Sequence, residues 1–221
     1  MDKTRPTSTI EDYLSLLLIL ERDNEPVVGA RLAELIGVSP PTVTNTLQRM
    51  LRDGLIIPDK TRGSLLTEKG LVAARSVMRR HMLSEWLLTR MVGWSKSHSQ
   101  AHAMEHVISS ELEAALLEDL KNPQTCPHGN PLPGFEHVAA KWTKLTNFHL
   151  GDTFIIRGVH ELAEEINGML PFLEEKKILP GVRAELVEIL PLNQTMSLKL
   201  EQGQVVTLGL NVAHYIFGER I

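Results

Sequence analysis

Several features are absent from the sequence of 221 residues or rare in it, and each absence excludes a class of protein. It contains a single cysteine, Cys126, so it cannot form an internal disulfide, and a reducing compartment is expected. The longest apolar run near the N-terminus, residues 14–20, is interrupted by Ser15 and is far shorter than the roughly 20 residues of a membrane span. No secretion signal is recognisable at the N-terminus. We therefore expect a cytoplasmic protein without a membrane partner.

An excess of positive charge is also missing, because the formal net charge is -4. The charge is unevenly spread, however. Residues 1–80 hold 12 Lys and Arg against 10 Asp and Glu, whereas residues 81–221 hold 11 against 17. A weakly basic N-terminal part on an acidic body is compatible with local contact to DNA, although it does not establish such contact.

Common enzyme motifs are absent as well. The chain has no glycine-rich phosphate loop and no nucleophile elbow. His160 and Glu161 do not form a zinc-protease motif, since position 164 holds Glu where the second His is required. A metal-dependent hydrolase with Glu105 or Glu85 as its base is therefore a disfavoured alternative.

What the sequence does have is a recurrence of metal-ligand side chains at helical spacing. His98, His102, Glu105 and His106 follow one another in steps of four, three and one, which predicts a single stripe on one helix face. A further pair, His81 and Glu85, has the spacing i, i+4 on the preceding predicted helix. Histidines on helices usually cap, pack or face water, but six such residues in register on two helices favour one metal site or two.

The first 70 residues have the pattern of a winged helix-turn-helix. Helical spacing of apolar residues covers 10–20, and a second helical segment, 28–36, stops at Gly37. A third helix is predicted over 41–52, after Ser39 as its N-cap. Two strand-like runs, 55–57 and 64–67, then flank a basic turn that carries Lys60 and Arg62, where they could meet phosphate.

The exposed face of the third predicted helix is rich in short or fork-shaped hydrogen-bonding side chains. These are Thr42, Thr44, Asn45, Gln48 and Arg49. Such side chains are suited to reading base edges and phosphates in the major groove of DNA, although a Thr-rich surface helix explains them equally well.

Beyond the wing, a helix is predicted from Thr67 to about Leu88 and, after a break at Gly93, a ligand-bearing helix from about Ser97 to Leu120. Their apolar residues exceed what a ligand site needs, which indicates a dimer interface or an intramolecular core. Residues 122–134 are dense in Pro and Gly and read as a linker that carries Cys126 and His128.

The last third of the chain is predicted to form a small barrel. One helix is expected over about 161–177. Five short strands are expected at 154–157, 184–189, 196–200, 205–208 and 214–217.

Taken together, several motifs resemble the diphtheria toxin repressor and manganese transport regulator family of metal-dependent bacterial repressors, in its three-domain form. The motifs are Glu11-Asp12-Tyr13-Leu14, Ser39-Pro40-Pro41-Thr42-Val43-Thr44, Arg52-Asp53-Gly54-Leu55, Leu66-Thr67-Glu68-Lys69-Gly70, Arg80-His81-Met82-Leu83, Glu105-His106-Val107 and Gly129-Asn130-Pro131-Leu132-Pro133-Gly134. They span essentially the whole chain, and their order and spacing carry the resemblance.

The resemblance implies a primary regulatory metal site. Its ligands would be Asp12, His102, Glu105 and His106. Iron-type members have Met and Cys at the first two positions, whereas manganese-type members favour Asp and Glu. An aspartate without a sulfur ligand favours Mn²⁺, while two imidazoles would also serve Fe²⁺ or Zn²⁺. Ser15 stands where manganese-type members have a further Glu ligand.

The resemblance also implies an ancillary site and a DNA-reading surface. The ancillary ligands would be His81, Glu85 and His98, to which a Cys-Pro-His connector and an acidic residue of the barrel would add Cys126, His128 and Glu161. The DNA-facing positions would be Ser39, Pro41, Thr42, Asn45, Thr46 and Arg49.

The sequence thus predicts a mostly α protein with small β parts. Its expected domains are a winged helix-turn-helix over 1–73, a helical metal-binding and dimerisation domain over 74–140 and a five-stranded, src-homology-3-like barrel over 141–221. The expected function is that of a homodimeric repressor of metal-homeostasis genes that binds operator DNA, is activated by Mn²⁺ or Fe²⁺ and has no small organic substrate. A DNA-binding protein with a vestigial metal site stays as a further alternative.

Overall fold

In the computed structural model, which describes residues 5–221, the chain divides into two compact units. The first unit contains the chain up to Arg80 together with Glu105–Val107, and the second contains His81–Met104 and Ile108–Ile221. Residues 1–4 of the predicted first domain lie outside the described residues. No helix within 5–221 combines the length and the apolar character of a membrane span.

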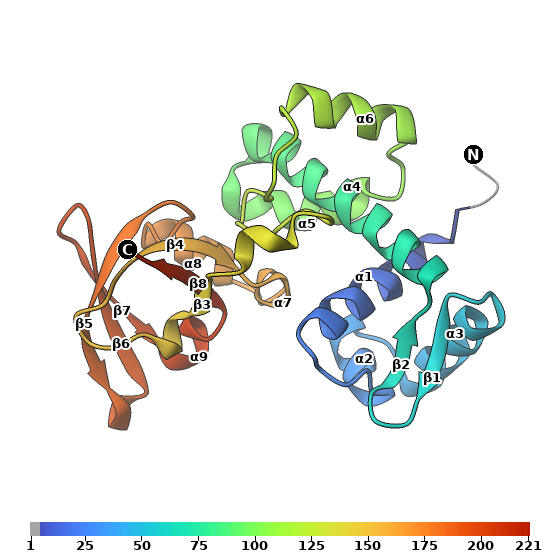
Figure 1. Ribbon diagram of the computed structural model, residues 1–221, viewed down its shortest axis with the longest axis horizontal. Helices are drawn as coiled ribbons and strands as arrows, with labels where there is room; N and C mark the ends of the chain where they lie inside the picture. Colours follow the sequence, from blue (N-terminus) through green and yellow to red (C-terminus); the bar gives the residue numbers. More distant parts are fainter. Residues whose placement is uncertain (1–4) are drawn as a thin grey trace. The chain divides into compact units, whose positions relative to one another are not determined.

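The first unit is the winged helix-turn-helix that the sequence predicts (Figure 1). Its elements are α1 (Ser8–Arg22), α2 (Gly29–Ile36), α3 (Pro40–Arg52), β1 (Ile56–Asp59), β2 (Gly63–Leu66) and the first half of α4 (Glu68–Val92). Gly37 ends α2 in the left-handed conformation, with φ 73°, and its N–H donates to the carbonyl of Ala33. The helical and wing boundaries lie within a few residues of those expected from the sequence.

Apolar residues at helical spacing build the core of this unit, as their periodicity predicts. The buried side chains come from the three helices and from the start of the wing. On α1, α2 and α3 they are Tyr13, Leu14, Leu17, Leu20, Leu32, Val43 and Met50, and at the start of the wing they are Leu55 and Ile56. Because these side chains fill one face of each helix, the opposite face of α3 stays exposed for contact with a partner.

The second unit begins in the middle of α4, which ends before Gly93 at φ 92°. Two helices follow, α5 (Trp94–Met104) and α6 (Ser110–Asp119). The single helix predicted from about Ser97 to Leu120 is therefore wrong. The hydroxyl oxygen of Ser109 accepts from the N–H of Leu112, so Ser109 caps a new helix, and the intervening residues 105–107 fold with the first unit.

The barrel part of the second unit is a six-stranded antiparallel sheet in the order β3-β8-β4-β5-β6-β7. Its strands are β3 (Thr143–Lys144), β4 (Thr153–Val159), β5 (Arg183–Leu190), β6 (Thr195–Leu200), β7 (Val205–Gly209) and β8 (Ile216–Arg220). The five predicted strands are all present, although the last begins at Ile216 because α9 (Leu210–Ala213) continues up to His214. The sixth strand, β3, has two residues and thus no readable period.

Short helices complete the second unit. They are α7 (Glu161–Glu164), α8 (Met169–Glu175) and the 3₁₀ turns η1 (Glu136–Ala139), η2 (Leu145–Asn147) and η3 (Pro191–Asn193). The one helix predicted over 161–177 is thus two helices, because Gly168 adopts φ 83° and interrupts it. The barrel core is built from Phe154, Ile156, Leu173, Leu186, Leu198, Leu208 and Ile216 with their neighbours.

Candidate metal centres

A first cluster of metal-ligand side chains lies in the first unit and consists of Asp12, Glu105 and His106. Asp12 stands on α1, and the other two follow the end of α5. The Nε2 atom of His106 is 3.1 Å from Asp12 Oδ1 and 3.6 Å from Glu105 Oε1. Around a cation with ligands at roughly 2.1 Å, neighbouring ligand atoms lie about 3 to 3.4 Å apart. The spacing therefore fits one ion held by two carboxylates and one imidazole.

Buried Glu11 fixes the ring of His106 in the first cluster. Its Oε2 atom is 2.7 Å from His106 Nδ1, which leaves Nε2 to face the other two ligands. The Oε1 atom of Glu11 accepts from Arg80 at 2.7 Å and from Arg5 at 3.1 Å. Arg80 also donates to the carbonyl of Glu105 at 2.8 Å. This carboxylate–imidazole pairing is the usual support of a metal-binding histidine.

Sequence reasoning missed Glu11 and Arg80 as parts of this site. A signal was present, since Glu11 lies beside Ile10 and Leu14 on the face of α1 that is buried. A charged residue on such a face requires a partner of opposite charge, and Arg80 meets that requirement.

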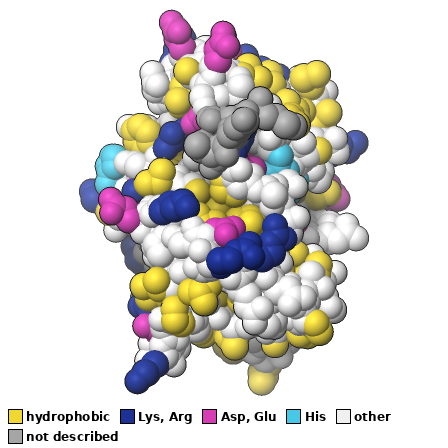
Figure 2. Space-filling model, turned by 90° about the vertical axis from the view of Figure 1, so that its right-hand side faces the viewer, with side chains coloured by type: hydrophobic (Ala, Val, Ile, Leu, Met, Phe, Trp, Pro, Cys, Tyr) yellow, Lys and Arg dark blue, Asp and Glu magenta, His cyan; other side chains and the backbone are white. Residues whose placement is uncertain are grey.

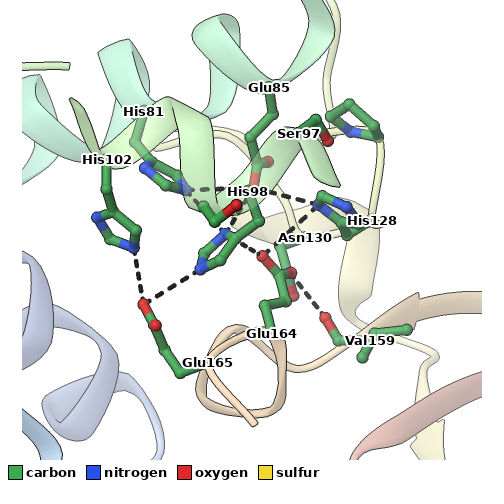
Figure 3. Close-up of polar contacts among 12 residues, drawn as sticks. His81, Glu85, Ser97, His98, His102, His128, Asn130, Val159, Glu164 and Glu165 are labelled. Carbon is green, nitrogen blue, oxygen red and sulfur yellow. Dashed lines mark hydrogen bonds and ion pairs between the residues drawn. The ribbon is translucent and has the colours of Figure 1, made fainter. Parts of the chain in front are cut away.

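A second cluster lies wholly within the second unit (Figure 3). It consists of His81, Glu85, His98, Cys126, His128 and Glu164, all of which are buried. Glu85 Oε1 is 3.2 Å from His81 Nε2, 2.8 Å from His98 Nδ1 and 3.1 Å from His128 Nδ1. Glu164 Oε2 is 2.7 Å from His98 Nδ1. Helices α4, α5 and α7 and the connector thus contribute to one group of donors.

The connector that carries Cys126 and His128 is ordered, although the sequence indicates an irregular linker. The N–H of Cys126 donates to the carbonyl of Asn130, and the N–H of Val159 in β4 donates to the carbonyl of His128. His128 Nε2 lies 3.0 Å from the carbonyl of Trp94, which assigns its proton to Nε2 and leaves Nδ1 to the cluster. Backbone hydrogen bonds thereby set the positions of both connector ligands.

The charges of the second cluster depend on one another. Burial alone would raise the pKa of Glu85, but His128 and His81 outweigh burial and hold this pKa well below its usual range. Burial, and then the charge of Glu85, raise the pKa of Glu164. Burial lowers the pKa of His128, yet Glu85 and Glu164 more than compensate and raise it to about 9. Imidazolium charge thus offsets the carboxylates, which is a task that a bound cation can also perform.

The second cluster fits a metal ion by its donor chemistry. Among the described residues, Glu85 Oε2 is a buried oxygen without a hydrogen-bond partner, an arrangement that native proteins avoid unless an ion or water satisfies the atom. The donors combine sulfur, imidazole and carboxylate, which suits a borderline transition metal. Burial raises the pKa of the Cys126 thiol, with Glu85 adding to the effect, so Cys126 would become a thiolate only with an ion beside it.

Two ligands predicted from the sequence occupy other places than expected. His102, predicted for the primary site, groups with His81 and His98, and its Nε2 is 2.7 Å from Glu165 Oε1. The end of α5 at Met104 explains the divergence, because His102 stays on the helix while Glu105 and His106 leave it. Glu161 is buried near Cys126, but its neighbour Glu164 reaches the histidines.

The predicted DNA-facing residues lie on α3, at its N-cap and in the wing of the first unit. Five of the six positions predicted on α3 or at its N-cap are exposed, namely Ser39, Pro41, Thr42, Asn45 and Arg49. Thr46 differs, since it is buried and its hydroxyl donates to the carbonyl of Thr42 at 3.0 Å. Lys60 and Arg62 are exposed in the wing turn. Figure 2 shows this side of the molecule, where Lys and Arg side chains lie among hydrophobic and uncharged polar ones.

Three family models match the chain in succession. Residues 6–64 match the N-terminal DNA-binding domain of iron-dependent repressors, and residues 67–134 match their metal-binding and dimerisation domain. Residues 143–220 match the FeoA domain. The iron-dependent repressor IdeR of Mycobacterium tuberculosis is 34% identical over 96% of this chain and 97% of its own length. The chain belongs to the family of iron-dependent repressors.

Other metal-dependent repressors are similar to the chain in sequence or in structure. The diphtheria toxin repressor of Corynebacterium diphtheriae is 40% identical over 59% of this chain and 58% of its own length. A manganese-dependent transcriptional repressor in complex with manganese superposes with a TM-score of 0.83 and 27% identity, covering 96% of this chain and 99% of the other. ScaR with bound Zn²⁺ gives a TM-score of 0.80 and 29% identity over 98% and 100%.

Membership of this family settles the class of protein. The chain is a metal-dependent, DNA-binding transcriptional repressor that uses a divalent metal ion. It is not an enzyme, because the family consists of transcriptional regulators. The predictions of fold, function class and cofactor class are thereby confirmed, whereas the individual ligands stay predictions.

Proposed function

We propose that this repressor responds to Mn²⁺ and that the first cluster is its regulatory site. The observation that carries the proposal is the approach of Asp12 Oδ1 and Glu105 Oε1 to within 3.1 and 3.6 Å of His106 Nε2. Two carboxylates and one imidazole, without sulfur, are the donors that suit a hard divalent cation. The carboxylate of Glu11 contacts His106 Nδ1 and thereby orients the ring and raises the basicity of its metal-facing nitrogen.

The regulatory effect follows from where these residues stand in the chain. Asp12 belongs to α1 of the DNA-binding unit, whereas Glu105–Val107 are continuous in sequence with the second unit on both sides. A bound ion supplies the positive charge that joins α1 to this segment. Glu105 and His106 then restrain the DNA-binding unit, which selects arrangements of two recognition helices that match successive turns of DNA.

The DNA partner would be contacted by α3 and the wing of each copy in a dimer. Ser39, Pro41, Thr42, Asn45 and Arg49 offer hydroxyl, apolar, amide and guanidinium groups for base edges and phosphates. Apolar side chains exposed in the second unit, among them Met91, Val92 and Leu112, supply a surface for the second copy. Operator DNA, a homodimer and a cytoplasmic location complete this proposal.

The second cluster is proposed as an ancillary metal site with a structural task. His81, Glu85, His98, Cys126, His128 and Glu164 come from three helices and the connector, so one ion there holds these segments together. A cation bound there would replace the imidazolium charge that otherwise offsets the two buried carboxylates.

A second candidate activator is Fe²⁺. The observation that favours it is the set of relatives, since IdeR is an iron-dependent repressor and is similar along nearly the whole chain. Imidazole and carboxylate ligands also serve Fe²⁺. The choice between the two ions depends on donor number and geometry at the first cluster.

Titration of DNA binding with separate metals tests the proposed function. A duplex selected from random-sequence DNA by the Mn²⁺-loaded protein serves as the probe, and its fluorescence anisotropy reports binding. Mn²⁺, Fe²⁺ without oxygen, and Zn²⁺ are added separately to the full chain, with a chelator as the blank. For each metal, the concentration that activates DNA binding is expressed as a multiple of that metal's binding constant. The proposal expects this multiple to be lowest for Mn²⁺. Activation by Fe²⁺ alone would instead establish the iron-responsive alternative.

A further inference from the structure

The burial pattern of α3 directs its exposed face toward a residue that the proposed function does not use. Thr46, which the family resemblance assigns to DNA, is buried, whereas Gln48 is exposed. Gln48 follows Asn45 by three residues and Thr44 by four, and all three are exposed, which is the spacing of one helix face. The exposed face of α3 is therefore centred near Asn45 and Gln48.

Asn45 and Gln48 present two neighbouring carboxamides on this face. Within residues 5–221, neither side chain has a hydrogen-bond partner. A carboxamide matches the N6 and N7 atoms of adenine in the major groove, because it offers one acceptor and one donor side by side. The α3 sequence contains no Asp or Glu, and Arg49 and Arg52 stand in its last turn. No charge on α3 itself thus repels the phosphates while the amides approach base edges.

An apolar pocket lies beside Gln48, between α3 and the wing. Figure 1 shows α3 and β1 side by side. This α3 pocket has a volume of about 180 Å³, and its lining includes Thr44, Leu47, Gln48, Leu51, Ile56 and Pro58. Among the described residues that line it, none is charged. The hydroxyl of Thr44 donates to the carbonyl of Pro40 at 3.1 Å, so it needs no partner in the pocket.

Operator DNA supplies an apolar group that suits the α3 pocket. A recognition helix lies in the major groove, where the 5-methyl group of thymine is the apolar group that a base pair presents. The pocket adjoins the exposed face of α3, because Gln48 belongs to both. A phosphate would lose its hydration against the apolar walls without gaining a charged partner, whereas a methyl group gains from leaving water.

We propose that the α3 pocket receives the 5-methyl group of a thymine and that Gln48 binds an adjacent adenine. The Gln48 amide nitrogen donates to N7 of the adenine, and its amide oxygen accepts from the N6 amino group. This inference rests on the proposed contact between α3 and DNA. It gives each half-site a position at which A and T are preferred, in addition to the contacts of Asn45 and Arg49.

Base analogues that lack single groups test this proposal. The probe is a duplex selected from random-sequence DNA with whichever of Mn²⁺, Fe²⁺ and Zn²⁺ activates binding, so the test does not depend on the Mn²⁺ proposal. Each thymine is replaced in turn by deoxyuridine, which lacks the 5-methyl group. Each adenine is replaced in turn by 7-deazaadenine, which lacks the N7 acceptor. Fluorescence anisotropy gives the Kd of the full-length wild type, Leu51→Ala and Gln48→Ala.

Two substitutions in the barrel serve as matched controls. Leu192→Ala removes a leucine side chain that is 99% exposed, and Gln202→Ala removes an exposed carboxamide. Leu51 is itself 47% exposed, so its replacement leaves the core of the first unit intact, as circular dichroism will verify. Metal affinity measured without DNA should be the same in all four variants and the wild type.

In the wild type, deoxyuridine at one thymine of each half-site should raise the Kd about fourfold, the effect of losing one buried methyl-sized group. At an adjacent adenine, 7-deazaadenine should raise the Kd at least about fivefold, because a hydrogen bond is lost. The deoxyuridine effect should fall below about twofold in Leu51→Ala, and the 7-deazaadenine effect should do so in Gln48→Ala. Both effects should persist in the two controls.

Three results would overturn the proposal. The first is that no thymine of the duplex is sensitive to deoxyuridine. The second is that Leu51→Ala or Gln48→Ala keeps the full effect of its analogue. The third is that Leu51→Ala weakens binding of every duplex by the same factor, which would assign the pocket to the sugar–phosphate backbone or to the fold. Failure of α3 as the DNA-contacting helix is distinguishable, because Arg49→Ala would then bind the unmodified duplex like the wild type.

Discussion

At the scale of single residues, the decisive feature of the first cluster is Glu11, the side chain that contacts the ring nitrogen of His106 not facing the other ligands. Glu11 is 3% exposed, accepts from Arg80 and holds Nδ1 of His106 at 2.7 Å. A carboxylate in this position selects the ring tautomer and raises the basicity of the metal-facing nitrogen. Glu11 is therefore a positioning residue whose removal should weaken metal binding.

We predict that Glu11→Gln lowers Mn²⁺ affinity at the first cluster by about 10- to 100-fold, the usual effect of losing such a partner. Free Mn²⁺ measured by electron paramagnetic resonance during a titration of the full chain gives the affinity. Glu34→Gln is the control, because Glu34 is 71% exposed and contacts Arg31 of its own helix. Equal Mn²⁺ affinity in Glu11→Gln and the control would remove Glu11 from the site.

At the scale of elements, α3 separates a reading face from a packing face. Arg49 is exposed on it, whereas Thr46 is buried and bonded to the carbonyl of Thr42. The two residues were predicted together as DNA contacts. Only burial, which a sequence pattern of small polar residues does not reveal, distinguishes them.

Arg49→Ala should weaken DNA binding by about 1 to 3 kcal/mol, as expected for a recognition-helix arginine, and leave metal affinity unchanged. Thr46→Val, which preserves the shape of a buried side chain, should change DNA affinity little. Fluorescence anisotropy with the selected duplex measures the first quantity, and a Mn²⁺ titration without DNA measures the second. Loss of Mn²⁺ binding in Arg49→Ala would contradict the assignment of α3 as the DNA-recognition helix.

The connector is the second element whose geometry matters. Gly129 adopts φ 99° between His128 and Asn130, and an added Cβ there would lie 2.0 Å from the carbonyl oxygen of Arg157 in β4. Gly134, with φ 100°, has nothing within 4 Å of such a Cβ. Comparing an alanine substitution at Gly129 with one at Gly134 therefore distinguishes the effect of steric overlap from the effect of backbone strain.

Gly129→Ala should destabilise the protein by about 1 to 3 kcal/mol more than Gly134→Ala, because overlap with β4 is added to the strain that both share. It should also reduce Zn²⁺ affinity at the second cluster, since Cys126 and His128 move with Gly129. Thermal unfolding and Zn²⁺ titration measure the two effects. Equal stability of both variants would contradict the close packing of the connector on β4.

At the scale of the whole molecule, the sequence predicted most of the fold and only part of the sites. Helical periodicity and caps located α1, α2 and α3, and the order of motifs identified the family. The break between α5 and α6 was missed, because the ligand stripe runs on to His106, past the end of α5 at Met104, and Ser109 caps a new helix three residues later. The sequence also does not reveal that His102 groups with His81 and His98, or that Glu164 and not Glu161 reaches His98, because these neighbours depend on how the helices pack.

The central claim concerns the whole protein, namely that an ion at the first cluster controls DNA binding. The most direct test compares the wild type with His106→Ala in anisotropy titrations with the selected duplex, with Mn²⁺ and with chelator, after circular dichroism has verified both folds. The account predicts that Mn²⁺ strengthens DNA binding by the wild type at least about tenfold and leaves His106→Ala at the chelator level. Equal activation of His106→Ala by Mn²⁺, or tight DNA binding by the wild type in chelator, would contradict it.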